Sequence, residues 1–139
     1  MAKVVITGKI PAIAVERLRA EHEVVSWDEP VAISRDELLK RVKGAVAIVS
    51  LLTEKVDAEL LDAAGSQLKV VSNVAVGYNN IDVPACKERN VLVTNTPGVL
   101  TEATADIAMA LILMSTRRLA EGERVIRKQE PWQWGMFYM

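Results

Sequence analysis

Short apolar segments alternate with helical patterns along the first two thirds of the chain. Five of these segments are rich in Val and Ile and are predicted to be β-strands. A strand with one wet face alternates apolar and polar side chains. Strands that are apolar along most of their length therefore favour a parallel sheet covered on both faces. The predicted strands are Lys3–Thr7, Glu23–Trp27, Ala45–Leu51, Lys69–Val74 and Val91–Thr94.

The segments between these strands carry signals for helix ends. Ser34 begins a capping box that Glu37 completes, and Asp57 and Asp82 are expected to cap two further helices. Pro11 suits the first turn of another helix. The regular alternation of strands and helices predicts right-handed crossovers. We therefore expect an α/β fold, a flavodoxin-like parallel five-stranded sheet with helices on both faces.

A longer helix is predicted to begin at Thr101, which is expected to cap it, and the helical pattern continues toward Arg127. Its segment Ile107–Met114 is apolar nearly all round, and a helix without a polar face must be buried on every side. This pattern favours packing against a second domain or a second subunit. The alternative is a central helix within one compact domain. The candidate interface residues are Ala108, Leu111, Ile112, Trp132 and Trp134.

Composition narrows the possible partners. The chain has 139 residues, of which 50% are hydrophobic and 25% charged, and a net charge of -1. Its Lys and Arg residues are scattered, which argues against a nucleic-acid surface. The longest apolar run is far short of the roughly 20 residues that span a bilayer, and the first residues do not resemble a signal peptide. The single cysteine, Cys86, excludes an internal disulfide and fits a cytoplasmic location.

The loops that follow the strands are the places to look for chemistry, because ligands bind beyond the carboxyl ends of strands in open α/β sheets. In the loop Val74–Asn80, Gly77 is expected to tolerate a positive φ and to let a ligand approach the backbone. Consecutive free N–H groups there would hold a carboxylate without a basic side chain. The alternative is a plain turn. In the preceding loop, Leu52 either walls a small substrate or packs at the strand end.

Other features are weaker or negative. The N–H groups around Leu100–Thr104, where the long helix begins, would face a phosphate or a nicotinamide, with ordinary capping as the alternative. No two of the seven glycines are spaced as Gly-x-Gly, so a dinucleotide-binding fingerprint is absent from these residues. No metal-ligand spacing occurs, and no metal is expected. The only histidine, His22, is expected to be a solvated surface residue.

Several motifs occur in an order and at spacings that are highly specific together. They are Leu51–Gly65 (LLTEKVDAELLDAAG), Leu68–Ser72 (LKVVS), Ala75–Asp82 (AVGYNNID) and Asn90–Leu113 (NVLVTNTPGVLTEATADIAMALIL). The chain resembles the NAD(P)-dependent D-2-hydroxyacid dehydrogenases, and within them most resembles the glyoxylate/hydroxypyruvate reductase branch. The resemblance implies a substrate domain into which a nucleotide-binding domain is inserted. It also implies reduction of 2-oxo acids to D-2-hydroxy acids with NAD or NADP.

By position, the resemblance assigns roles to several residues. The backbone of Val76 and Gly77 would hold the substrate carboxylate, and Leu52 would line the substrate pocket. Leu100 and Thr104 would approach the cofactor. The helix that begins at Thr101 would join two domains, and the segment after it would contribute to a homodimer.

The same resemblance implies that much of the enzyme lies outside these residues. The family's catalytic arginine and its histidine–glutamate pair fall beyond residue 139, so no catalytic residue is expected within this chain. We expect a substrate domain over residues 1–98. Residues 99–139 would hold an interdomain and dimerisation helix and the start of the nucleotide-binding domain. The alternative function is a non-catalytic binding or oligomerisation module with a flavodoxin-like fold.

Overall fold

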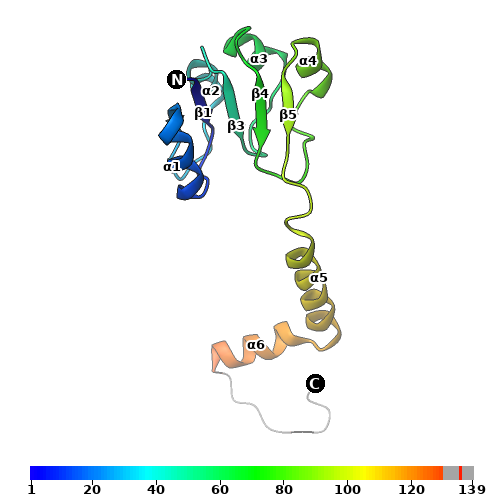
Figure 1. The fold of residues 1–139 in the computed structure, drawn as a ribbon. Helices are drawn as coiled ribbons and strands as arrows, with labels where there is room; N and C mark the ends of the chain where they lie inside the picture. Colours follow the sequence, from blue (N-terminus) through cyan, green and yellow to red (C-terminus); the bar gives the residue numbers. More distant parts are fainter. Residues whose placement is uncertain (130–134, 136–139) are drawn as a thin grey trace. The chain divides into compact units, whose positions relative to one another are not determined.

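The computed structural model describes residues 1–129 and residue 135. The chain divides into two compact units, Met1–Pro97 and Gly98–Met139. The first unit contains a five-stranded sheet with the order β2-β1-β3-β4-β5 (Figure 1). All neighbouring strands run parallel. This order confirms the flavodoxin-like prediction, and every predicted strand is present within two residues of its expected bounds.

The elements of the first unit alternate strictly between strand and helix. In chain order they are β1 (Lys3–Ile6), α1 (Ala12–Glu21), β2 (Glu23–Ser26), α2 (Arg35–Arg41), β3 (Ala47–Ser50), α3 (Ala58–Ala64), β4 (Val70–Asn73), α4 (Val83–Glu88) and β5 (Leu92–Thr94). The expected side-chain caps are confirmed for α2, α3 and α4. The capping oxygens accept hydrogen bonds from backbone N–H groups, Ser34 from Glu37 (3.3 Å), Asp57 from Leu60 (3.2 Å) and Asp82 from Ala85 (3.0 Å).

The main core lies on the face of the sheet that α2, α3 and α4 cover. The chain moves in one direction along the sheet from β2 to β5, so right-handed crossovers place these three helices on the same face. Val5, Ile48 and Val71 point into this core from the three central strands, and each is fully buried. Leu38 of α2 and Leu60 of α3 pack against them. The central strands are thereby held in position beneath their carboxyl-end loops.

The opposite face of the sheet is flanked by α1, as expected for a sheet with helices on both faces, but this cover extends over only part of the sheet. The step from β1 to β2 runs the other way, so among the helices of the first unit α1 is the one over this face. Val4 and Ile6 of β1 are buried. Further across the sheet Val49 and Val70 are only half-buried, and Leu92 of the edge strand is 70% exposed. Apolar strands show that both faces need a cover, but not which segment supplies it.

The described residues of the second unit form two helices, α5 (Thr101–Thr116) and α6 (Leu119–Lys128). A single helix reaching Arg127 was expected, but the chain turns at Arg118, which has a φ of 53°. Just before the turn the Thr116 hydroxyl donates to the carbonyl oxygen of Ile112 at 2.9 Å. Short polar side chains of this kind compete for backbone acceptors and weaken a helix near its end. No described helix is long and apolar enough to cross a membrane.

Two further expectations for α5 are wrong. Thr101 does not cap the helix, because Leu100 occupies the cap position and the Thr101 hydroxyl donates to the carbonyl oxygen of Gly98 at 3.4 Å. The central-helix alternative also fails, since α5 belongs to a separate unit and none of its residues is buried. The packing of α5 against a second domain or a second subunit stays a prediction from its all-round apolar pattern.

Candidate functional site

Three loops meet at the carboxyl edge of the sheet, because parallel strands all end on the same side. They follow β1, β3 and β4, and backbone hydrogen bonds tie them to one another. The N–H of Thr7 donates to the carbonyl oxygen of Val49 at 3.0 Å, and the N–H of Val74 donates to that of Ser50 at 2.8 Å. The loop after β4, residues 74–80, carries the predicted carboxylate site. The loop after β3 carries Leu52.

In the loop after β4 the carbonyl groups of Ala75, Val76 and Gly77 accept hydrogen bonds, whereas the N–H groups of Val76 and Gly77 are open. The carbonyl oxygen of Ala75 accepts from the Thr96 N–H at 2.8 Å, and that of Val76 accepts from the Asn95 side-chain amide at 2.7 Å. No described residue accepts a hydrogen bond from the N–H of Val76 or Gly77. In a trans peptide the N–H points opposite to the carbonyl. Holding the carbonyls inward therefore turns these N–H groups outward.

These outward N–H groups, which we call the cradle, belong to Val76 and Gly77. Successive open N–H groups form concavities that attract anions. Val76 is 38% exposed and the following residue, Tyr78, is 53% exposed, so an anion can reach the cradle from solvent.

The role expected of Gly77 needs one correction. Its φ is not positive, and the described glycines with positive φ are Gly44, Gly65 and Gly98. A β-carbon built on Gly77 would meet no atom within 4 Å. Glycine is therefore not required here by backbone strain or by packing within the chain. What its missing side chain provides is open space directly beside the cradle.

Leu52, the predicted wall residue, lies on a loop that is anchored by a buried carboxylate. Leu52 is 58% exposed at the rim, whereas Glu54 is only 5% exposed. Glu54 Oε2 accepts hydrogen bonds from the Leu51 N–H at 2.9 Å and from the Thr7 hydroxyl at 2.5 Å. Its other oxygen accepts from the Thr53 hydroxyl. These three hydrogen bonds replace those that the carboxylate would make with water, and they fix the loop to the end of β1.

An ion-pair cluster anchors the same loop from its far side. The Arg35 guanidinium donates to the carbonyl oxygen of Lys55 at 2.7 Å and pairs with Asp57 and Glu59. Partial burial alone would raise the pKa of Asp57, but hydrogen bonds from Arg35 and the Leu60 N–H outweigh it and hold that pKa below its usual value. The loop that carries Leu52 is thus fixed at both ends.

The other predicted residues lie outside this edge. Leu100 and Thr104 belong to the second unit, and both are exposed. The Thr104 N–H is not open to a ligand, since it donates to the carbonyl oxygen of Leu100 at 2.9 Å. Exposed residues of α5 include Leu111 and Ile112, at 57% and 55%, and Ala108 is also exposed. Trp132 and Trp134 lie outside the described residues.

His22 differs from its expected role in one respect. It follows α1 at the amino edge of the sheet, the end opposite to the cradle. It is half-buried rather than solvated, and its Nδ1 is buried without a hydrogen-bond partner. Its position nevertheless places it away from the loops described above.

Sequence reasoning did not assign a role to several polar side chains that hold the site loops. Glu54 and Asn73 are buried, whereas Asn80 and Asn95 are half-buried, and Asn80 was expected only as a turn former. Their one visible signal is that polar residues interrupt apolar strand ends. Such an interruption does not show which partners a polar group will find.

The strand order and the crossovers define an open α/β domain, a class of fold in which ligands bind beyond the carboxyl ends of the strands. The chain belongs to the D-isomer specific 2-hydroxyacid dehydrogenase family, since the model of that family's catalytic domain matches residues 4–132. This membership confirms the resemblance identified from the sequence motifs. It also agrees with the parallel sheet and its strand order.

Individual relatives support the same assignment. The chain is 47% identical over 128 residues to a glyoxylate reductase of Thermococcus onnurineus, a match that covers 92% of this chain and 38% of the relative. The crystal structure of the TT0316 protein from Thermus thermophilus superposes with a TM-score of 0.90 at 39% identity, covering 98% of this chain and 43% of that one.

A third relative carries ligands in its crystal. It is the NADPH-dependent glyoxylate/hydroxypyruvate reductase of Sinorhizobium meliloti in complex with NADP and malonate, with a TM-score of 0.69 and 32% identity. The match covers 91% of this chain and 38% of that one. The present chain therefore spans about two fifths of the length of these relatives, as a substrate-domain portion does.

Proposed function

We propose that this chain is the substrate-binding portion of an oxidoreductase that reduces glyoxylate- or hydroxypyruvate-type 2-oxo acids to D-2-hydroxy acids with NADH or NADPH. The observation that carries the proposal is the cradle of Val76 and Gly77. Its two N–H groups are open, whereas the carbonyl groups of the same two peptide units, those of Ala75 and Val76, accept hydrogen bonds within the chain. A site of this kind suits a carboxylate. Membership of the 2-hydroxyacid dehydrogenase family supplies the class of reaction.

In the proposed reaction this chain binds and orients the substrate. The cradle holds the carboxylate by hydrogen bonds to a charged group, which are stronger than neutral ones. Leu52 forms an apolar wall at the rim of the site. A bound nicotinamide supplies the hydride that the carbonyl carbon accepts and is itself oxidised, while a proton completes the hydroxyl group. We place the proton donor outside this chain.

The proposed contact of this chain with the cofactor is limited to Leu100 and Thr104. Both are exposed near the beginning of α5 and are accessible to a ligand. The described residues hold no Gly-x-Gly spacing, so the phosphates would be bound elsewhere. NAD and NADP both remain candidates. Their discrimination depends on residues after the second strand of a nucleotide-binding domain.

The direct test of the proposed function is an assay of the full-length gene product. We expect it to oxidise NADH or NADPH when glyoxylate or hydroxypyruvate is supplied, as followed by nicotinamide absorbance. The product should be the D-enantiomer where the 2-hydroxy acid is chiral. A full-length protein that reduces none of several 2-oxo acids with either cofactor contradicts the proposal.

A second prediction concerns the 139-residue chain by itself. We expect it to show no reductase activity and no measurable NADH binding, because it holds neither a glycine-rich phosphate loop nor the proposed acid/base pair. Calorimetric titration with NADH checks this, with the full-length protein as the positive control. Binding of NADH to the short chain in the micromolar range would show that the cofactor site has been placed wrongly.

We further propose that the second unit contributes to a homodimer. The apolar residues of α5 are exposed together, including Ile107, Leu111 and Ile112. Monomeric proteins rarely leave so large an apolar patch in water, and two-fold dimers are the commonest way of covering one. Ala108 lies in the same segment. Trp132 and Trp134 remain candidates that fall outside the described residues.

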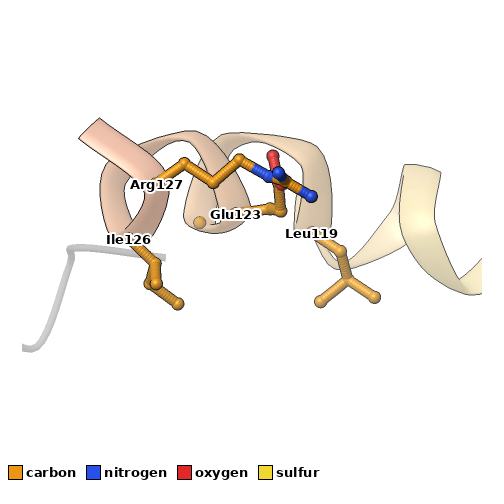
Figure 2. Close-up of a pocket in the computed structure, with 5 residues that line it drawn as sticks. Leu119, Glu123, Ile126 and Arg127 are labelled. Carbon is orange, nitrogen blue, oxygen red and sulfur yellow. The ribbon is translucent and has the colours of Figure 1, made fainter. Parts of the chain in front are cut away.

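Helix α6 adds a second apolar surface to this proposal. Figure 2 shows Leu119 and Ile126 on the same side of the helix, where they flank a shallow hollow. Glu123 and Arg127 form an ion pair that leaves this apolar side free. Leu119 is 46% exposed and Ile126 is 76% exposed. A helix with one apolar and one charged side is suited to lie on another surface.

Sedimentation of the full-length protein tests the proposed assembly. We expect a dimer at micromolar concentration. The double variant Leu111→Glu/Ile112→Glu should shift it toward monomer, because burying two unpaired carboxylates is strongly unfavourable. Ile13→Glu serves as the matched control, since Ile13 is 67% exposed on α1. A monomeric wild-type protein would end the proposal.

We also propose that the protein functions in the cytoplasm. The single cysteine, Cys86, is fully buried and unpaired. Burial raises the pKa of its thiol, so that the reactive thiolate is disfavoured. A chain without disulfides suits a reducing compartment.

A further inference from the structure

The side-chain amide of Asn73 is fully buried directly beneath the cradle. Its Nδ2 donates to the carbonyl oxygen of Gly77 at 2.9 Å and to Asn80 Oδ1 at 3.1 Å. Its Oδ1 accepts from the Ser50 hydroxyl at 3.0 Å. A backbone carbonyl can only accept, so the nitrogen of Asn73 must face Gly77. The amide therefore has one permitted orientation.

Asn80 holds Asn73 in that orientation and connects it to the neighbouring loop. Asn80 Nδ2 donates to the carbonyl oxygens of Leu51 and Glu54 at 3.1 and 3.0 Å. These two acceptors fix the orientation of the Asn80 amide in the same way. Its oxygen must then face the nitrogen of Asn73. The two asparagines thus join the loop that carries Leu52 to the loop that carries the cradle.

The contacts of Asn73 and Asn95 have a combined effect on Gly77. Asn95 holds the carbonyl oxygen of Val76 at 2.7 Å, and Asn73 holds that of Gly77 at 2.9 Å. These carbonyls belong to the two peptide planes on either side of the Gly77 α-carbon. Glycine populates more backbone conformations than any other residue. Holding both flanking planes removes that freedom before any ligand arrives.

We infer that Asn73, supported by Asn80 and Ser50, is a positioning residue that preorganises the Gly77 backbone to receive the carboxylate of the substrate. The inference rests on the function proposed above. Asn73 does not touch the substrate in this arrangement. It fixes the orientation of the peptide group that follows Gly77, and through Asn80 it connects this peptide group to the loop that carries Leu52. Preorganisation of this kind increases affinity by lowering the entropy lost on binding.

The test compares a charged with a neutral substrate in the full-length protein. Glyoxylate carries the carboxylate, whereas methyl glyoxylate presents the same aldehyde without the charge. In Asn73→Asp the side chain keeps its size but loses its donors and gains an acidic group, so the uncharged variant Ser50→Ala described below controls for repulsion between carboxylates. We expect KM for glyoxylate to rise about tenfold, the scale on which one hydrogen bond acts. The ratio of kcat/KM for glyoxylate to that for methyl glyoxylate should fall by a similar factor, with KM for the nicotinamide unchanged.

Two further variants complete the design. Ser50→Ala removes only the hydroxyl that supports Asn73, and we expect the same ratio to fall about threefold. It decides the question if Asn73→Asp does not fold. Gln67→Ala is the matched control, because the Gln67 amide donates to the carbonyl oxygen of Ala45 at 3.3 Å, beside the amino end of the sheet. Its removal should leave the ratio unchanged.

The outcomes separate the two proposals. If the wild-type protein reduces no 2-oxo acid, the proposed function fails. If the wild type prefers glyoxylate but a folded Asn73→Asp variant keeps the full preference, the positioning role of Asn73 is wrong while the function stands. An equal loss with both substrates would show that Asn73 only stabilises the fold, and would also overturn the inference.

Discussion

Replacing Gly77 with valine in the full-length protein is expected to raise KM for glyoxylate about 100-fold. A β-carbon at this position points into open space, so the added side chain meets no atom within 4 Å of that carbon. The same open space is where the carboxylate would reach the N–H groups of Val76 and Gly77. Obstructing two hydrogen bonds to a charged group removes about 3 kcal/mol, which corresponds to roughly 100-fold.

The structure predicts that this substitution weakens glyoxylate binding without weakening the fold. Since φ at Gly77 is not positive, valine adds no left-handed strain and the thermal midpoint of unfolding should stay nearly constant. Initial rates at varied glyoxylate and varied nicotinamide supply the measurement, with KM for the nicotinamide as the internal control. Gly77→Ala should give a smaller rise in the same direction. If KM for glyoxylate in Gly77→Val stays within about twofold of wild type, the carboxylate binds somewhere else.

Replacing Leu60 with alanine is expected to lower the free energy of unfolding of the first unit by about 3 kcal/mol. Leu60 is fully buried and packs among the side chains between α3 and the sheet. The shorter side chain removes less apolar surface from water when the protein folds. It also leaves a cavity that the close-packed neighbours fill only in part. Urea titration of the 139-residue chain, followed by circular dichroism, measures the change.

Leu92→Ala is the matched control for this experiment. The substitution is chemically the same, but Leu92 lies on the edge strand β5 and is 70% exposed. Its replacement should change the free energy of unfolding by less than about 1 kcal/mol. Equal losses for the two variants would mean that the packing between α3 and the sheet contributes far less than the burial of Leu60 indicates.

The local parts of the fold could be predicted because their signals are local. A capping oxygen bonds an N–H three residues away, so Ser34, Asp57 and Asp82 could be identified from short segments. Apolar strand patterns and a regular alternation with helices led to the strand order, since crossover handedness leaves few topologies open. The turn at Arg118 was missed, because a left-handed non-glycine residue leaves no mark in the hydrophobic pattern.

The candidate site was predicted less completely. Its position in the loop of Val76 and Gly77 followed from the motifs and from the rule that ligands bind at carboxyl edges. The side chains that hold this loop were not recognised. Asn80 was expected to be a turn former, yet its amide joins residues 51 and 54 to Asn73. The contacts to residues 51 and 54 link positions more than twenty residues apart, and no spacing in the sequence specifies such partners.

By itself, the sequence determined the family and the strand order, because both follow from residue patterns within short segments and from the order of those segments along the chain. Only the tertiary structure decided that Asn73 and Asn95 hold the carbonyl groups inward and leave the cradle open. It also decided that Gly77 provides space rather than a left-handed turn. Hydrogen-bond direction and empty volume are properties of groups brought together by folding, and neither exists until the loops have met.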